Sequence, residues 1–312
     1  MEANGSGGCG VREVPSAVTD LDRKARRVGT RYADICTVWR LWGAGDPVVF
    51  LHGGFGSWTH WLRNIEPLAA HHCVMVPDMP GFGDSDPIKG EPDAATIANH
   101  LWHGLDRLTR RDIPVTLAGF SFGGAIAGTM ASLRPGRTRR LILVGSGGIR
   151  APRGPVGELV RWRDAGDEAA MQAAHRRNLE ILMLHDPSRI DSLSVALQAE
   201  NTRRTRGKSR PISRGVDLAA QLAGSGVAVA GIWGEFDATA GDHLQERADI
   251  LRTVDPQSPF VVIEGAGHWV QFEAADRFNE TMIALLRDDP GRASGLRAGQ
   301  TPNETTPVGG MP

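Results

Sequence analysis

The chain has 312 residues, of which 41% are hydrophobic and 23% charged, and its 35 basic side chains nearly cancel its 36 acidic ones. A chain of this length can bury a full hydrophobic core, and we expect one large domain or one domain with an insertion. The balanced charge argues against a nucleic-acid partner, because phosphate binding requires a clear basic excess. Only residues 203–214 are locally basic, which is typical of a solvated helix end and loop.

Both ends of the chain contain little that could be buried. Residues 1–28 are rich in Gly, Ser, Pro and charge, and residues 289–312 are similarly polar. We expect both to be disordered tails. The N-terminal stretch lacks the basic start and apolar run of a signal peptide, and no run of about 18 apolar residues occurs. The sequence therefore predicts a cytoplasmic protein with no membrane partner.

The three cysteines, Cys9, Cys36 and Cys73, lie far apart and form no CxxC pair. This spacing favours neither a zinc site nor a disulfide framework, and reduced thiols are expected. We predict no metal and no cofactor.

Short apolar runs alternate with helical patterns between the two ends of the chain, which is typical of strands joined by crossover helices. Most of these runs are continuously apolar and end in Gly, Asp or Ser, as buried parallel strands do. The runs cover residues 35–39, 47–53, 73–78, 115–120, 140–146, 227–234 and 259–265. An α/β fold with a doubly wound, mostly parallel sheet is predicted, with its ligand site at the loops that follow the strands.

The alternation of strands and helices stops between about residues 150 and 215, where the sequence is helical and polar. We interpret residues 150–215 as a helical cap inserted into the sheet domain. The core is then formed by residues 29–149 and 216–288. Pro and Gly residues at 152–155 mark the expected entry to the cap, and Pro211 and Gly215 mark its return.

The strongest chemical signal is the motif Gly119-Phe120-Ser121-Phe122-Gly123, which joins an apolar strand to a helix rich in small residues. A sharp strand-to-helix turn strains the serine backbone and brings neighbouring chains close, so that only glycine fits two residues before and after the serine. The motif predicts Ser121 as a nucleophile held above the edge of the sheet.

A serine hydroxyl needs a general base, and histidine has a suitable pKa. His268 follows the last predicted strand and precedes the C-terminal helix, which places it at the same edge of the sheet. Asp237 follows the preceding strand and is the predicted carboxylate that orients His268. Glu235 is the alternative carboxylate.

Backbone donors for an oxyanion are expected in the glycine-rich loop His52-Gly53-Gly54-Phe55-Gly56, which follows the strand at 47–51. We predict one donor in the N–H of Phe122 and another in the N–H of Gly54 or Phe55. A plain glycine turn is the alternative for this loop.

Several aromatic residues cluster near the predicted site in the sequence and suggest an apolar or aromatic acyl pocket. They are Phe55, Trp58, Phe120, Phe122 and Trp269. Each could equally belong to the hydrophobic core. We take Trp58, Phe120 and Trp269 as candidate pocket residues.

These motifs together resemble the α/β-hydrolase family across residues 30–288. The resemblance rests on HGGFGSW at 52–58, DMPGFGDSD at 78–86, GFSFGG at 119–124, WGEFD at 233–237 and GAGHWVQFEAADRFN at 265–279. It implies an eight-stranded sheet with a cap and the triad order Ser121, Asp237, His268. The aspartate nucleophile of haloalkane dehalogenases and epoxide hydrolases is replaced by Ser121, which excludes both activities.

Trp61, residues 63–65 and residues 267–279 are similar to the hydrolases that cleave carbon–carbon bonds in aromatic ring-fission products. Those enzymes typically carry a serine where this chain has Gly54, an asparagine where it has Phe120, and a cap arginine near the position of Glu200. The expected function is therefore hydrolysis of a small carboxylic ester through an acyl-enzyme. A carbon–carbon hydrolase of vinylogous diketones, a perhydrolase without cofactor and a ligand-binding protein on the same scaffold are the alternatives.

Overall fold

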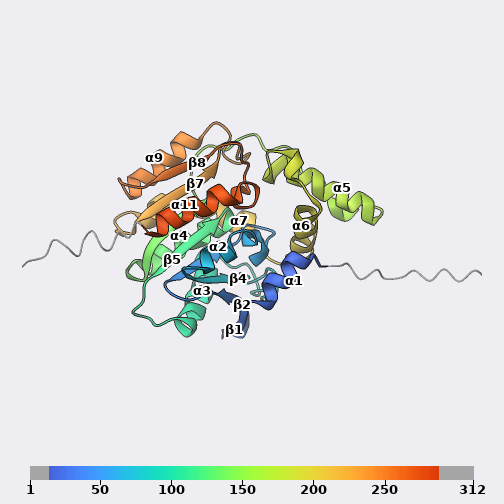
Figure 1. Ribbon diagram of the computed structural model, residues 1–312. Coiled ribbons are helices and arrows are strands. Elements are labelled where there is room, and N and C mark those ends of the chain that lie inside the picture. Colours follow the sequence, from blue (N-terminus) through green and yellow to red (C-terminus); the bar gives the residue numbers. More distant parts are fainter. Residues whose placement is uncertain (1–13, 288–312) are drawn as a thin grey trace, which may run out of the picture.

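The computed structural model describes residues 14–287, and its centre is one eight-stranded sheet (Figure 1). The strands are β1 (Arg26–Tyr32), β2 (Ile35–Trp42), β3 (Pro47–Leu51), β4 (Cys73–Pro77), β5 (Val115–Phe120), β6 (Thr138–Val144), β7 (Val229–Gly234) and β8 (Phe260–Ile263). Their spatial order is β1-β2-β4-β3-β5-β6-β7-β8. The pairs β1–β2 and β2–β4 are antiparallel and all others are parallel. This confirms the predicted fold class.

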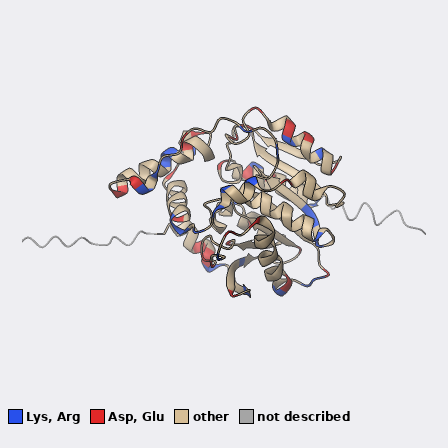
Figure 2. Ribbon diagram, turned by 180° about the vertical axis from the view of Figure 1, so that it is seen from behind, with Lys and Arg blue, Asp and Glu red and all other residues tan. Residues whose placement is uncertain are grey.

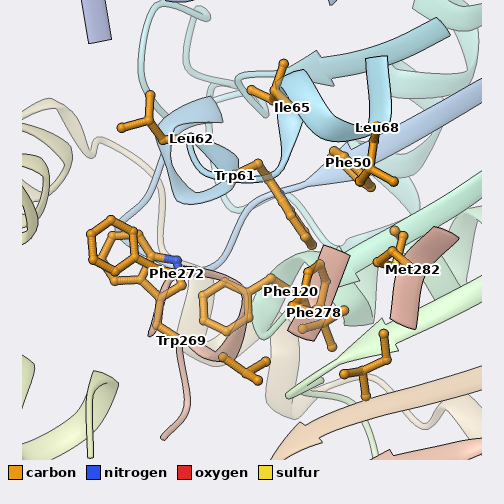
Figure 3. Packing of buried hydrophobic residues seen from close by; sticks show 14 of the residues in the cluster. Phe50, Trp61, Leu62, Ile65, Leu68, Phe120, Trp269, Phe272, Phe278 and Met282 are labelled. Atoms are coloured by element: carbon orange, nitrogen blue, oxygen red, sulfur yellow. The ribbon is translucent and has the colours of Figure 1, made fainter. Parts of the chain in front are cut away.

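Successive side chains of the central strands enter two different hydrophobic clusters. In β3, for example, Val48 and Phe50 belong to one cluster and Val49 and Leu51 to the other. Helices therefore cover both faces of the sheet, as doubly wound folds require. The first cluster is shown in part in Figure 3, where Trp61, Phe278 and Met282 pack around Phe50.

In chain order, one helix of the core precedes β1 and the others follow β3. They are α1 (Ser16–Arg23), α2 (Ile65–Ala69), α3 (Ala94–Leu108), α4 (Phe122–Leu133), α8 (Leu218–Leu222), α9 (Leu244–Val254), α10 (Val270–Glu273) and α11 (Ala275–Arg287). Buried residues of α3, α4, α8 and α9 belong to the second cluster, whereas those of α2, α10 and α11 belong to the first. Because α4 starts directly after β5, its first turn lies at the carboxyl edge of the sheet.

The prediction of a tail over residues 1–28 is wrong for its last part, because α1 and the start of β1 lie there. Asp22 of α1 pairs with the buried Arg40, and the carbonyl of Leu21 accepts a hydrogen bond from the indole of Trp42. The apolar-run criterion missed β1 because this antiparallel edge strand is mostly exposed and polar. Residues 1–13 and the predicted tail at 289–312 lie outside the described residues.

Between β6 and β7 the chain forms α5 (Glu168–Asn178), α6 (Ser192–Arg204) and α7 (Ser209–Arg214). Figure 1 shows α5 and α6 standing outside the sheet and the helices that cover it. We refer to residues 150–215 as the cap segment. The short helix α7 ends the cap segment and returns the chain to the core.

Basic and acidic residues alternate along the ribbon and do not separate onto different faces in the view of Figure 2. Within residues 14–287, no helix is both long enough and apolar enough to cross a membrane. In the same residues, no cluster of His, Cys, Asp and Glu has the arrangement of a metal site.

Candidate active site

Ser121 occupies the sharp turn between β5 and α4, with φ of 52° and ψ of −115°. This conformation is costly for a residue with a side chain and is characteristic of functional turns. A Cβ at Gly119 would collide with the backbone of Gly123, and one at Gly123 would collide with the carbonyl groups of Leu51 and His52. The two glycines are therefore required by close backbone approach, as the motif predicted.

The imidazole of His268 connects Ser121 to Asp237. His268 Nε2 lies 3.0 Å from Ser121 Oγ, and His268 Nδ1 lies 2.9 Å from each carboxylate oxygen of Asp237. Asp237 and His268 are 1% and 4% exposed, so solvent competes little for these contacts. The structure thus brings together the three side chains that the sequence analysis predicted as a triad.

Asp237 also accepts hydrogen bonds from the backbone N–H and the hydroxyl of Thr239, both at 2.8 Å. Burial alone would raise the pKa of Asp237, but the charge of His268 and the hydrogen bonds from His268 and Thr239 lower the pKa below its usual value. The carboxylate is therefore held ionised beside the imidazole. The alternative residue, Glu235, is exposed and instead accepts a hydrogen bond from the N–H of Gly265 at 2.9 Å.

The loop that carries His268 is fixed by a buried carboxylate that the sequence analysis did not identify. Glu273 accepts hydrogen bonds from the N–H of Gly267 at 2.6 Å, of His185 at 3.1 Å and of Asp186 at 2.7 Å. It thereby connects the His268 loop to the cap segment. No sequence signal distinguishes Glu273 from the other charged residues that follow His268, because its three partners are backbone groups.

The glycine-rich loop after β3 faces the first turn of α4. As the first residue of α4, Phe122 has an N–H without an acceptor inside the helix. Phe55 has a φ of 55°, an unusual value for a residue with a side chain. Gly54, Phe55 and Phe122 all line the cavity that contains Ser121 and His268.

Two buried histidines hold this loop. The ring nitrogen Nδ1 of His60 accepts a hydrogen bond from the N–H of Gly53 at 3.1 Å, and Nδ1 of His52 lies 2.8 Å from the carbonyl oxygen of Gly53. Burial lowers the pKa of both imidazoles, and nearby His52 and His268 lower the pKa of His60 further. Both rings are therefore neutral. Sequence reasoning missed the contact of His60, which lies in the 3-10 helix Trp58–Trp61.

The cavity above Ser121 has a volume of about 960 Å³. Leu159, Val160, Trp162, Leu182 and Met183 of the cap segment give it an apolar part. Five arginines also line the cavity, compared with only two carboxylates, those of Glu158 and Asp164. They are Arg153, Arg161, Arg163, Arg210 and Arg214, and none forms an ion pair with a residue in the range 14–287. The site is therefore partly apolar and partly electropositive.

Of the candidate pocket residues, only Phe120 lines this cavity. The prediction is wrong for Trp269, which is fully buried, stacks on Phe272 with ring centroids 4.1 Å apart and belongs to the core shown in Figure 3. It is also wrong for Trp58, which lines a second cavity between α1, α5 and α6. Proximity in the sequence could not distinguish these positions, because the two residues lie on turns that face the interior.

Residues 48–281, more than half of the chain, match the profile described as the alpha/beta hydrolase family. A dihydrolipoyllysine-residue acetyltransferase component of an acetoin cleaving system from Pseudomonas putida is 29% identical over 78% of this chain, and the match spans 64% of that protein. A 2-hydroxy-6-oxo-6-phenylhexa-2,4-dienoate hydrolase from Burkholderia cepacia is 28% identical over 78% of this chain and 88% of its own length.

Solved structures agree with the fold. A meta-cleavage product hydrolase from Pseudomonas fluorescens IP01 superposes with a TM-score of 0.70 at 23% identity, over 84% of this chain and 97% of that one. At this identity the likeness concerns the fold alone. Together with the matched profile and the mostly parallel eight-stranded sheet, it places the chain in the alpha/beta hydrolase family, as the sequence motifs predicted.

Proposed function

We propose that the protein is a serine hydrolase that cleaves a small carboxylic ester through an acyl-enzyme intermediate. The observation that carries the proposal is the chain of contacts from Ser121 Oγ through His268 to Asp237, with distances of 3.0 and 2.9 Å. A ligand-binding protein on this scaffold has no need of a base beside a strained serine. Membership of the alpha/beta hydrolase family supports the same conclusion.

In the proposed reaction Ser121 Oγ attacks the carbonyl carbon while its proton passes to His268 Nε2. The electron pair of the C=O bond moves to oxygen, where the N–H of Phe122 and that of Gly54 or Phe55 stabilise the charge. Collapse of this intermediate breaks the bond to the alcohol, whose oxygen takes the proton from His268. A water molecule, deprotonated by His268, then attacks the acyl carbon. The bond from this carbon to Ser121 Oγ breaks, Oγ takes the proton back from His268, and the acid is released.

A second candidate is the hydrolysis of carbon–carbon bonds in vinylogous diketones that carry a carboxylate. The arginines that line the cavity favour it, since an unpaired guanidinium can bind a substrate carboxylate in a bidentate fashion. Against it, the cap side of the same cavity also presents the apolar side chains Leu182 and Met183. Gly54 and Phe120 supply no side-chain hydrogen bonds for the oxygens of such a substrate. The ester reaction therefore remains the first proposal.

The experiment that separates the candidates is a comparison of p-nitrophenyl esters, from acetyl to long acyl chains, with one ring-fission dienoate. Wild-type protein and the Ser121→Ala variant are measured side by side. Ester turnover that disappears in Ser121→Ala supports the esterase, and faster turnover of the dienoate supports the carbon–carbon hydrolase. If wild-type protein turns over neither substrate but binds one of them, the ligand-binding alternative replaces both.

A further inference from the structure

Ser209, the first residue of α7, is a mostly buried residue that presents its hydroxyl to the active-site cavity. Its side chain is 4% exposed and lines the same cavity as Ser121 and His268. Among residues 14–287 the Ser209 hydroxyl has no hydrogen-bond partner. The Ser209 oxygen is not among the side-chain atoms that are cut off from solvent, so it is open to the cavity. The hydroxyl is therefore free to form a hydrogen bond with a molecule that enters the cavity.

The position of Ser209 relative to the glycine-rich loop suggests which substrate atom it meets. A Cβ added to Gly54 would collide with Ser209 Oγ, and that same position lies 3.8 Å from Cβ of Phe122. The hydroxyl therefore lies against the loop whose N–H groups, with that of Phe122, are the proposed oxyanion donors. The absence of a side chain at Gly54 leaves the space that Ser209 occupies.

The segment that leads to Ser209 is hydrogen-bonded and ion-paired to the core. The N–H groups of Arg206 and Gly207 both donate to the carbonyl of Gly81, at 2.8 and 2.9 Å. The guanidinium of Arg204 pairs with Asp84, and that of Arg206 donates to the carbonyl of Ser85. The backbone that leads to Ser209 is therefore in place before the substrate binds, and an effective donor to a developing charge requires such preorganisation.

We propose that the Ser209 hydroxyl donates a third hydrogen bond to the oxyanion formed when Ser121 attacks the substrate carbonyl. The proposal rests on the proposed serine-hydrolase function and extends it, because a residue of the cap segment then takes part in the chemical step. Loss of an interaction made only in the transition state lowers kcat and kcat/KM equally, without raising KM.

The test is the kinetics of Ser209→Ala and of Ser209→Cys, whose thiol keeps the size of the side chain but is a weak donor. With p-nitrophenyl butyrate we expect kcat to fall about 100-fold in Ser209→Ala, with KM within twofold of wild type. Benzeneboronic acid forms a tetrahedral adduct with a serine hydroxyl and presents an oxygen where the oxyanion lies. We expect the inhibition constant of benzeneboronic acid to rise as kcat falls across the variants. A purely structural role of Ser209 would not produce this correlation.

Ser258 provides a control, since it is a similarly buried serine whose hydroxyl has no partner among the described residues and which lies outside the cavity. Ser258→Ala should keep wild-type kcat and inhibition. A second comparison moves the hydroxyl to the loop. Gly54→Ser combined with Ser209→Gly should recover part of the lost rate, whereas Gly54→Ala with Ser209→Gly should not, because it adds a Cβ and no donor.

A kcat for Ser209→Ala and Ser209→Cys within twofold of wild type would overturn the proposal while leaving the serine-hydrolase function intact. A rise in KM at unchanged kcat would also overturn it, since the hydroxyl would then bind the ground state only. If wild-type protein neither hydrolyses an ester nor binds the boronic acid, the underlying function fails. These outcomes are distinguishable because adduct formation is measured without turnover.

Discussion

Nδ1 of His60 accepts a hydrogen bond from the N–H of Gly53 at 3.1 Å, deep beneath the proposed oxyanion loop. His60 is fully buried and neutral, and its ring lies edge-on to Phe120 and tilted to Trp269. Protonation of Nδ1 would remove the acceptor of the Gly53 N–H and place a charge in the core. The geometry of the loop is thereby coupled to the protonation state of a histidine that does not line the active-site cavity.

Stability should fall as the pH drops below about 6.5, where the histidines of the unfolded chain take up protons. Burial, and the repulsion that His52 and His268 would exert on a protonated ring, keep the pKa of His60 well below that value in the folded protein. The unfolded state therefore binds more protons in this range, and the free energy of unfolding decreases by up to about 1.4 kcal/mol per pH unit for this residue.

His60→Asn tests this linkage, because the amide oxygen can accept the hydrogen bond and does not titrate. Urea unfolding of wild type and variant at pH 7.5 and pH 5.5 should show a smaller loss of stability in His60→Asn. His71→Asn, at an exposed position, should keep the wild-type loss. An unchanged pH dependence in His60→Asn would show that other groups control it.

Asp237→Asn should lower kcat about 10⁴-fold while the protein stays folded, because an amide cannot hold the imidazole of His268 in the required tautomer. Steady-state hydrolysis of p-nitrophenyl butyrate measures this effect. Glu235→Gln is the control and should stay within twofold of wild type, since Glu235 contacts the Gly265 N–H and not His268. A large fall in kcat for Glu235→Gln with a near-normal kcat for Asp237→Asn would show that Glu235 orients His268.

Glu273→Ala should reduce both stability and turnover. The substitution leaves the N–H groups of Gly267, His185 and Asp186 without their acceptor, which we expect to lower the free energy of unfolding by about 3 kcal/mol. The loop of His268 loses its connection to the cap segment, so kcat should fall as well. Thermal unfolding and kcat are measured together. Wild-type values for both would contradict the positioning role of Glu273.

Arg40→Met should destabilise the fold by about 3–5 kcal/mol, because it leaves the buried carboxylate of Asp78 without a cation. The guanidinium of Arg40 lies 3.0 Å from Asp78 and 2.5 Å from both Asp84 and Asp22. Asp22→Asn removes only the most exposed of these partners and should lose less than about 1 kcal/mol. Denaturant unfolding compares the two, and equal losses would show that the burial of Arg40 is not decisive.

Arg210→Gln combined with Arg214→Gln should reduce selectivity for anionic substrates. Both guanidinium groups are exposed at the cavity and unpaired among residues 14–287, so we expect kcat/KM for mono-p-nitrophenyl succinate to fall about 10-fold at low salt. The value for neutral p-nitrophenyl butyrate should stay unchanged. Arg252→Gln, on α9 outside the cavity, is the control. Equal changes for both esters would exclude charge recognition by α7.

Much of this molecule follows from local sequence patterns. Apolar runs identified seven of the eight strands. Six of these runs are nearly continuously apolar, since a parallel strand buried on both faces has no polar alternation. The strand β1 was not predicted because it is an exposed edge strand without an apolar run. The glycines around Ser121 indicated a sharp turn because backbone crowding there excludes any other residue. Ser121, Asp237 and His268 were recognisable because each follows a strand whose end lies at the same edge of the sheet.

The sequence by itself thus determined the fold, the family and the positions of the three side chains that meet at the site. Only the tertiary structure decided that Trp58 and Trp269 lie away from the cavity, and that His60, Glu273 and Ser209 contact the loops around it. The physical reason is how far apart in the sequence the interacting residues lie. Strands, turns and the order of the triad are encoded within a few neighbouring residues, whereas these contacts join segments whose approach depends on how the whole cap segment and core pack.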